Sequence, residues 1–233
     1  MKIHSFPHNP TTSLSIALLI ILLWTGSLVF MLSLELTDAS LWFWLPLFIL
    51  IQTHLFTGLF ITAHDAMHHL ITPSLRLNHA IGWICSLLFM FNRYDQLYPK
   101  HHDHHRYPAT DRDPDFATGG FFRWYGSFVR QYVTVFQILA VAVLFNLLAL
   151  WIPQTNLILF WVIPSVLSTI QLFYFGTYLP HRGTHPADNP HKARSFTGGP
   201  AAAFFTCYFF GYHYEHHDRP YLAWWRLATA RIR

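Results

Sequence analysis

Residues 41–68 read LWFWLPLFILIQTHLFTGLFITAHDAMH, an apolar run that ends in two histidines. The run 41–63 contains no Asp, Glu, Lys or Arg, and about 20 apolar residues are enough for a helix to cross a bilayer. Directly after it come His64 and His68, which are four apart and therefore share one face of a helix. This stretch predicts a membrane-spanning helix with a candidate metal site at its end.

Three further apolar runs have spanning length: residues 14–32, 131–152 and 157–179. Hydrophobic residues make up 53% of the 233-residue chain and charged residues only 11%, against roughly 25% charged residues in soluble domains. So few charges exclude a water-soluble globular surface and also a disordered chain. We expect an all-α integral membrane protein with four transmembrane helices, in one domain over 1–233, with short interfacial helices at 80–91 and 200–211.

The positive charges predict the orientation in the membrane. Four spans place both termini on one side, and all 15 Lys and Arg residues lie outside the connectors 33–40 and 153–156. Because Lys and Arg mark the cytoplasmic side, we expect both termini and the histidine-rich segments to be cytoplasmic. This distribution accounts for the net charge of +4, so nucleic acid is not an expected partner.

The chain is also unusually rich in histidine, with 17 residues. After the HxxxH of residues 64–68 come two HxxHH patterns, whose positions i, i+3 and i+4 form one stripe on a helix. We therefore expect each pattern to present three imidazoles together. The eight candidate ligands are His64, His68, His101, His104, His105, His213, His216 and His217.

Eight imidazoles exceed the four ligands of one zinc ion and suit two ions. Imidazole favours Fe, Cu, Zn or Ni, and the only two glutamates are Glu35 and Glu215, which excludes the carboxylate-rich di-iron bundles. A zinc protease of the HExxH type is not supported. The three histidine patterns, which we call histidine boxes, together indicate an oxygen-activating di-iron centre. For any single box, the alternative is a polar turn that faces solvent or lipid headgroups.

Carboxylates commonly orient ligating imidazoles by accepting a hydrogen bond from them. Asp65 and Asp113 are the candidate catalytic carboxylates for this role. Asp103 and Asp115 are further candidates, with solvation at the headgroups as an equal alternative for Asp103, Asp113 and Asp115. We expect His54, His69 and His102 to have packing or supporting roles rather than to be ligands.

The residues around the boxes resemble a known family. The stretches FTGLFITAHDAMH (56–68), KHHDHH with DRDPDF (100–105 and 111–116), YFGTYLPHR (174–182) and GYHYEHHDRPYLAWWRL (211–227) resemble bacterial β-carotene 4-ketolases. These belong to the superfamily of membrane fatty-acid desaturases and hydroxylases. The matched stretches run, with gaps, from the second expected span to the C-terminus.

The resemblance implies a non-haem enzyme with two Fe that uses O2 and electrons from a reduced ferredoxin or a similar donor. It implies conversion of the C4 methylene of a β-ionone ring to a ketone, by two hydroxylations and loss of water. A carotenoid in the bilayer of a bacterial inner or thylakoid-type membrane would be the substrate, and β-carotene would pass through echinenone to canthaxanthin.

By position, the eight box histidines match the family's ligands, and His181 matches a further histidine that completes one iron's shell. Two positions depart from the family pattern: His69 stands where glycine is usual, and residues 107–110 read YPAT in place of an HPGT-like stretch. Both leave ring preference open.

Two rivals remain. A carotenoid hydroxylase or lipid desaturase would share the boxes, and a membrane metal-binding or transport protein is the non-enzymatic alternative. A transporter would favour ligands along a path within the spans.

Overall fold

The computed structural model describes residues 9–231. The regular secondary structure of this part of the chain is entirely helical, apart from one isolated β-bridge between Ser195 and Tyr212. The expectation of an all-α fold is confirmed for these residues. Three helical stretches are long and apolar enough to cross a membrane: α1 (Pro10–Leu32), α2 (Leu45–Met67) and the stretch Gln154–His181. The predicted spans 14–32, 41–63 and 157–179 fall largely within them.

The stretch Gln154–His181 contains two widened turns. Its parts are α7 (Gln154–Leu157), the π-helical η2 (Ile158–Val162), α8 (Ile163–Phe173), the π-helical η3 (Tyr174–Tyr178) and α9 (Leu179–His181). A proline ring inside a helix clashes with the carbonyl four residues earlier. For Pro164 and Pro180 that carbonyl belongs to Phe160 and Gly176, which lie in η2 and η3. The π turns therefore accommodate the prolines without breaking the helix.

The predicted span 131–152 is not one straight helix. The structure has α5 (Phe121–Tyr132) and α6 (Val135–Leu148), bent by 81° at the short break between them. A capping box starts α6, since Thr134 and Gln137 exchange hydrogen bonds between side chain and backbone. The 14 residues of α6 extend about 21 Å at 1.5 Å per residue, so four crossings remain a prediction.

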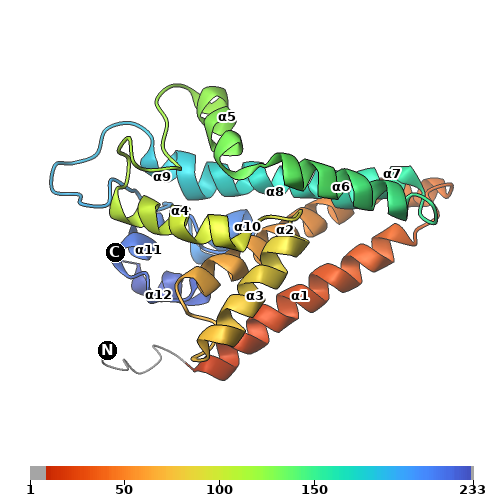
Figure 1. Cartoon of the computed structure of the whole chain (residues 1–233), viewed down its shortest axis with the longest axis horizontal. Coiled ribbons are helices and arrows are strands. Elements are labelled where there is room, and N and C mark those ends of the chain that lie inside the picture. The colour runs from red at the N-terminus through yellow and green to blue at the C-terminus, as the bar shows by residue number, and fades with distance from the viewer. Residues whose placement is uncertain (1–8, 232–233) are drawn as a thin grey trace.

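A buried amide joins two connectors at one end of the long helices. The side-chain nitrogen of Asn156 donates to the carbonyls of Met31, Leu32 and Leu34, at 3.4, 3.2 and 2.8 Å. The end of α1 and the start of α7 therefore lie together, on the right of Figure 1. This agrees with the expectation that connectors 33–40 and 153–156 share one side. Residues 1–8 and 232–233, and hence the predicted sidedness of both termini, lie outside the described residues.

The short helices gather at the opposite end of the long helices (Figure 1). They include α3 (Leu75–Leu88), α4 (Tyr94–Arg106), α10 (Pro200–Cys207), α11 (His213–Asp218), the 3-10 turn η4 (Trp224–Arg226) and α12 (Leu227–Ala230). Another 3-10 turn, η1 (Ala39–Phe43), precedes α2. The expected interfacial segments 80–91 and 200–211 correspond to α3 and α10.

Asn78 fixes α3 against the end of α2. Its buried side chain donates to the Ala66 carbonyl at 2.6 Å and accepts from the Ile71 amide at 3.2 Å. Because Ala66 lies in the last turn of α2, Asn78 helps to hold the helix end that carries the first histidine pair.

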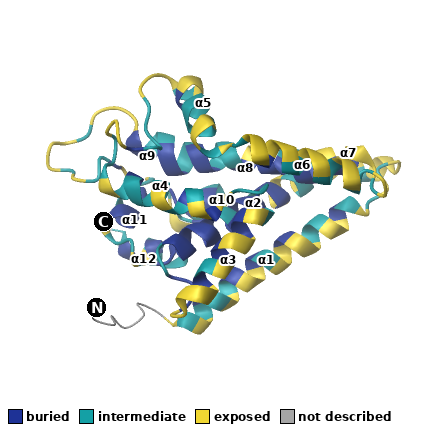
Figure 2. Ribbon diagram, in the orientation of Figure 1, coloured by how far each residue is buried: buried dark blue, intermediate teal, exposed yellow. Residues whose placement is uncertain are grey.

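The outer faces of α1 and α6 are apolar and exposed, whereas the C-terminal half of α2 is largely buried (Figure 2). On α6, Val135, Ile138 and Val143 are each more than half exposed. Such wide apolar exposure is unusual for a soluble monomer and is the surface that a bilayer covers. Together with the apolar helices, it is typical of a membrane protein.

Candidate metal centre

The structure brings all nine predicted metal ligands together, in two neighbouring groups. Within each group the candidate ligand atoms lie within 4.8 Å of one another. The five-histidine group contains His64, His68, His101, His105 and His216, and the four-histidine group contains His104, His181, His213 and His217.

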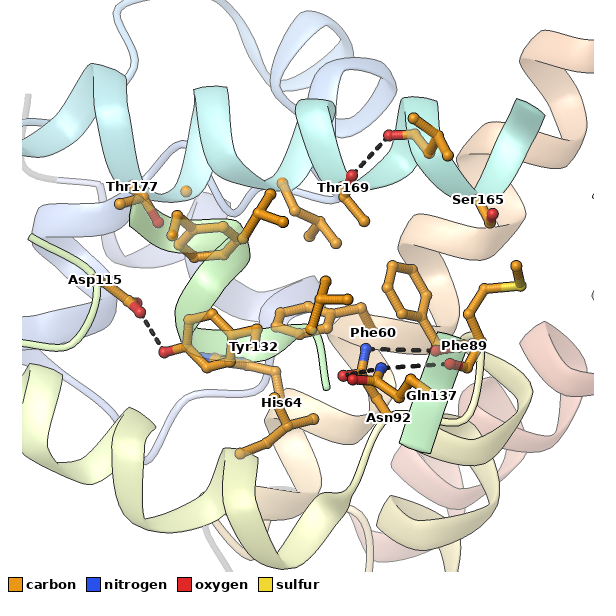
Figure 3. A pocket seen from close by; sticks show the side chains of 18 of the residues that line it. Phe60, His64, Phe89, Asn92, Asp115, Tyr132, Gln137, Ser165, Thr169 and Thr177 are labelled. Atoms are coloured by element: carbon orange, nitrogen blue, oxygen red, sulfur yellow. Dashed lines mark hydrogen bonds between the residues drawn. The ribbon is translucent and has the colours of Figure 1, made fainter. Parts of the chain in front are cut away.

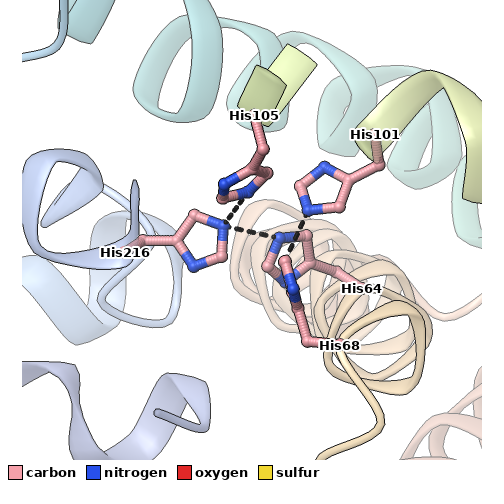
Figure 4. A group of neighbouring side chains, drawn as sticks. All are labelled: His64, His68, His101, His105 and His216. Carbon is pink, nitrogen blue, oxygen red and sulfur yellow. Dashed lines mark hydrogen bonds between the residues drawn. The ribbon is translucent and has the colours of Figure 1, made fainter. Parts of the chain in front are cut away.

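The five-histidine group joins three helices, α2, α4 and α11 (Figure 4). The Nε2 atom of His216 lies 3.1 Å from that of His64 and 2.8 Å from that of His105. The Nε2 atoms of His68 and His101 are 2.7 Å apart. The rings thus direct the same atom toward one small volume.

The four-histidine group is fully buried. Three of its Nε2 atoms form a triangle: His104 lies 3.3 Å from His213 and 3.0 Å from His217, and His217 lies 3.0 Å from His213. His181 faces this triangle, with ring centroids 4.9 Å from those of both His104 and His213.

His181 reaches the group because of the helix end that carries it. It is the last residue of α9 and follows Pro180 and the π turn η3. Its Nδ1–H donates to the Lys192 carbonyl at 2.7 Å, so its Nε2 carries the lone pair, and this buried nitrogen has no partner among the described residues. The bond to Lys192 fixes the tautomer that a metal ligand needs.

Each HxxHH pattern is divided between the two groups, which corrects the expectation that its three imidazoles act together. In α4, His101 and His105 belong to one group and His104 to the other. In α11, His213 and His217 belong to the four-histidine group, whereas His216 belongs to the five-histidine group. Positions i+3 and i+4 are about 100° apart around a helix axis, so a helix between two sites serves one with its i, i+4 pair and the other with i+3.

The donor set fits metal ions better than hydrogen bonds. A neutral imidazole nitrogen carries either a proton or a lone pair, so three Nε2 atoms in a triangle cannot all be paired with one another. The buried Nδ1 atoms of His64, His213 and His217 also lack partners among the described residues. A cation at each group would take up the converging lone pairs, and an imidazole-rich set suits iron, copper or zinc.

Burial keeps most of these imidazoles in the neutral form that binds metals. It lowers the pKa of six of them well below the usual value, and neighbouring histidines lower it further; the six are His68, His101, His105, His213, His216 and His217. Burial acts in the same direction on His104, but its hydrogen bond to Asp113 and the nearby Asp115 outweigh it and raise its pKa.

Of the two candidate catalytic carboxylates, Asp113 contacts a ligand candidate directly. His104 Nδ1–H donates to Asp113 Oδ1 at 2.9 Å, and the amides of Ala109 and Asp115 donate to the same carboxylate. Asp113 is therefore a fixed acceptor that directs Nε2 of His104 into its group.

Asp65 has a different environment. It accepts a hydrogen bond from the Trp224 amide at 3.1 Å, and its other oxygen lies 3.7 Å from His64 Nδ1, beyond hydrogen-bond distance. Its contacts thus link α2 to the C-terminal segment, and its catalytic role stays a prediction. Asp103 makes no side-chain hydrogen bond within residues 9–231.

The histidines expected in supporting roles lie outside both groups. His69, with a positive φ of 60°, contacts the Tyr98 hydroxyl at 3.2 Å, and Tyr98 packs on His102 at 4.5 Å between ring centroids. His54 stacks on Tyr208 at 4.2 Å. These contacts agree with roles in packing around the centre.

An apolar cavity of about 700 Å³ ends at both histidine groups. His64 and His101 of one group and His104 and His213 of the other line it, together with side chains of α2, α5, α6 and α8 (Figure 3). Its lining residues on the α8 side run from Ser165 to Thr177, about 18 Å along a helix of 1.5 Å rise. Sequence reasoning did not anticipate this cavity, because its walls come from segments that no local pattern joins.

Gly176 allows the inner wall of the cavity to close. A Cβ atom at this position would lie 2.3 Å from the ring of Phe210, which itself lines the cavity and packs on His64 with 4.8 Å between ring centroids. Any larger residue at 176 would displace the Phe210 ring.

Asp115 and Tyr132 form a hydrogen-bonded pair in the cavity wall (Figure 3). The Tyr132 hydroxyl donates to Asp115 Oδ1, and Asp115 Oδ2 lies 3.9 Å from Nδ1 of His104. Burial raises the pKa of Asp115, while His104, the Tyr132 hydrogen bond and the Lys100 ammonium oppose that rise.

A family model described as fatty acid desaturase matches residues 39–138 and 120–233. The chain therefore belongs to the fatty acid desaturase family, in which histidine clusters of this kind indicate non-haem iron.

Within that family the chain is similar to β-carotene ketolases. It is 45% identical to the β-carotene ketolase of Paracoccus sp. (strain PC1), over 77% of this chain and 76% of that protein. The β-carotene ketolase of Paracoccus sp. (strain N81106 / MBIC 01143) is 42% identical over 78% and 76%. A zeaxanthin 4-ketolase of Chlamydomonas reinhardtii is 40% identical over 76% of this chain and 42% of its own length. No solved structure matches the chain.

Proposed function

We propose that this protein is a membrane β-carotene 4-ketolase that oxidises the C4 methylene of a β-ionone ring to a ketone. The observation that carries the proposal is an apolar cavity ending at two groups of converging imidazoles, in a chain 42–45% identical to the two Paracoccus β-carotene ketolases. The products from β-carotene are echinenone and then canthaxanthin.

The cavity suits a hydrocarbon ring. Ligand pockets typically enclose about 300–1,000 Å³, and this one is lined mainly by aromatic and aliphatic side chains such as Phe60, Phe89 and Phe145. At the histidine end of the cavity, His64 and His213 both pack on Phe210, with 4.8 and 5.3 Å between ring centroids. A ring that enters along α6 and α8 therefore has its edge presented between the histidine groups, while the rest of the molecule remains in apolar surroundings.

Nine imidazoles would hold two iron ions, five at one group and four at the other. When bound, the iron would supply the activation of O2 that C–H oxidation requires. The protein's own residues orient the histidines and enclose the substrate. Asp113 and the Lys192 carbonyl fix the tautomers of His104 and His181. Phe210 forms part of the apolar wall of the cavity.

The chemistry balances as two oxygenations and a dehydration. Each oxygenation consumes one O2, two electrons and two protons; one oxygen atom enters the C4–H bond and the other leaves as water. The second gives a geminal diol, which loses water to form the ketone. A one-electron donor protein of the ferredoxin type supplies the electrons.

The proposed site faces the cytoplasm, with both termini on that side of a bacterial inner or thylakoid-type membrane. Support comes from the positive charges, which avoid the connectors at 33–40 and 153–156, and from the Asn156 bonds that hold these connectors at one end.

The test is expression in a host that accumulates β-carotene, followed by mass analysis of the pigments. A ketolase replaces two hydrogens by one oxygen at each ring, a hydroxylase adds one oxygen, and a desaturase removes two hydrogens. Hydroxylated or desaturated products without ketone would favour the alternative activities of the superfamily. No O2-dependent product, with metal still bound, would favour a metal-binding or transport protein.

A further inference from the structure

We infer that Asp115 and Tyr132 form a hydroxyl-binding subsite in the cavity, which holds the ring alcohol between the two oxygenations and releases the ketone. The inference rests on the proposed function and adds a binding site for the intermediate. Asp115 and Tyr132 come from different segments, the loop before α5 and the last residue of α5.

The position of the pair is suited to C4. Asp115 and Tyr132 line the same cavity as the histidines, and Asp115 Oδ2 is 3.9 Å from Nδ1 of His104. In Figure 3 the pair lies on the side of Thr177 and His64, away from Ser165. A hydroxyl on the part of the ring that lies beside His104 can therefore reach Asp115 and Tyr132.

Several polar side chains along the cavity have their groups engaged elsewhere, whereas the hydroxyl of Thr177, which also lines the cavity, makes no side-chain hydrogen bond among the described residues. Gln137 donates to Asn92 at 2.8 Å and caps its own helix, and the Tyr125 hydroxyl pairs with Thr169 at 2.8 Å. The Ser165 hydroxyl donates to the Val162 carbonyl at 2.7 Å.

The direction of the Tyr132–Asp115 bond determines what the subsite accepts. The single hydroxyl proton of Tyr132 is donated to Asp115, so the carboxylate and the phenol oxygen both offer lone pairs to the cavity. An alcohol or geminal diol has an O–H to donate to them. A ketone has none, so its oxygen gains nothing at this subsite and faces two other oxygens.

The energetic consequence is selective retention. A hydrogen bond to a charged group is stronger than one between neutral groups, and a buried hydroxyl without a partner is penalised. The unreacted ring has no hydroxyl and binds through apolar contact alone. The alcohol is therefore held for the second oxygenation, and loss of its hydrogens on ketone formation favours product release.

The test measures binding and product ratio together. Purified full-length protein, kept anaerobic without a reductant, is titrated with β-carotene, its 4-alcohol and its 4-ketone, and the shift of carotenoid absorbance is followed. We expect the wild type to bind the alcohol at least about tenfold more tightly than the ketone, since one hydrogen bond to a charged group provides a ratio of this size or larger. Tyr132→Phe should reduce this preference, and Asp115→Asn should abolish it, because an amide also donates to a ketone.

In cells making β-carotene, both variants should accumulate the 4-alcohol at the expense of the ketone. Tyr174→Phe is the matched control, because Tyr174 packs on Phe121 of α5 with 6.2 Å between ring centroids but does not line the cavity; it should leave the alcohol-to-ketone ratio unchanged. Metal content is measured for Asp115→Asn, since Asp115 lies near His104.

An unchanged alcohol preference and product ratio in both variants, in a protein whose wild type makes ketone, would remove the subsite and leave the ketolase assignment intact. A wild type that makes no ketone would instead contradict the proposed function.

Discussion

The Nδ1–H of His181 donates to the carbonyl of Lys192, 11 residues further along the chain, at 2.7 Å. The bond crosses the base of the polar loop that follows α9 and points Nε2 of His181 toward His104 and His213. The loop thus orients a side chain of the site, although it contributes no member of either histidine group.

His181→Ala should abolish ketone formation and lower the iron content while the protein still inserts into the membrane. Alanine has no donor atom, so the four-histidine group would retain three imidazoles. Pigment analysis and elemental analysis of purified protein measure both effects. His185→Ala is the control, since His185 belongs to neither histidine group and hydrogen-bonds to the His181 carbonyl at 3.2 Å; it should have a milder effect. Full iron occupancy with normal ketone yield in His181→Ala would exclude it as a ligand.

Asp113→Ala should weaken iron binding about 10- to 100-fold, the usual effect of removing a carboxylate that orients a ligating histidine. Without Asp113, His104 Nδ1 loses its acceptor and the ring its fixed tautomer. Competition with a chelator measures the change. Asp103→Ala, in the same segment as His104 but without a side-chain hydrogen bond among the described residues, should bind iron as the wild type does. Equal chelator sensitivity of the two variants would contradict the role of Asp113.

Ala142→Phe should block turnover without loss of iron, because Ala142 lines the cavity on α6 and a phenyl ring there occupies the space of the substrate. Val143→Phe is the matched control: it adds bulk at the next position, which is 60% exposed and outside the cavity. Normal ketone yield from Ala142→Phe would show that substrate does not use this cavity.

A reporter fused after Arg233 should be active on the cytoplasmic side, and one inserted at residues 37–40 on the opposite side. The expectation follows from the positive charges. A third reporter between Trp151 and Gln154 decides whether α5 and α6 cross the membrane: it should match the insertion at 37–40. A cytoplasmic signal at 151–154 would leave three crossings or a re-entrant α6.

Asn156→Ala should lower the melting temperature in detergent, with a cost of about 1–3 kcal/mol for leaving buried carbonyls unpaired. The Asn156 side chain serves the carbonyls of Met31, Leu32 and Leu34. Thr155→Ala, at the exposed neighbouring position, should melt as the wild type does. Indistinguishable melting curves for the two variants would mean that these bonds are dispensable.

The sequence predicted the long helices and all nine residues of the two groups, eight by spacing and His181 by resemblance. Apolar runs without charges predict helices that lie in lipid. Repeated histidines at i, i+3 and i+4 are rare unless they bind a metal. How the imidazoles divide could not be predicted, since it depends on α4 and α11 lying between the two groups rather than beside one.

The apolar run at 131–152 did not predict the bend within it, for a physical reason. Hydropathy responds to composition, whereas the 81° bend depends on a capping box at Thr134 and Gln137 that ends one helix and starts another. The Asp115–Tyr132 pair had no local signal either, because the two residues meet only when the loop before α5 folds back.

The division of α4 and α11 between the two groups also determines how the protein can be assembled. Neither group is complete until both helices have docked, since each helix gives ligands to both. An ion bound at one group therefore positions donors for the second, and metal uptake becomes cooperative with folding. A cell short of iron would hold fully loaded and empty molecules rather than half-loaded ones.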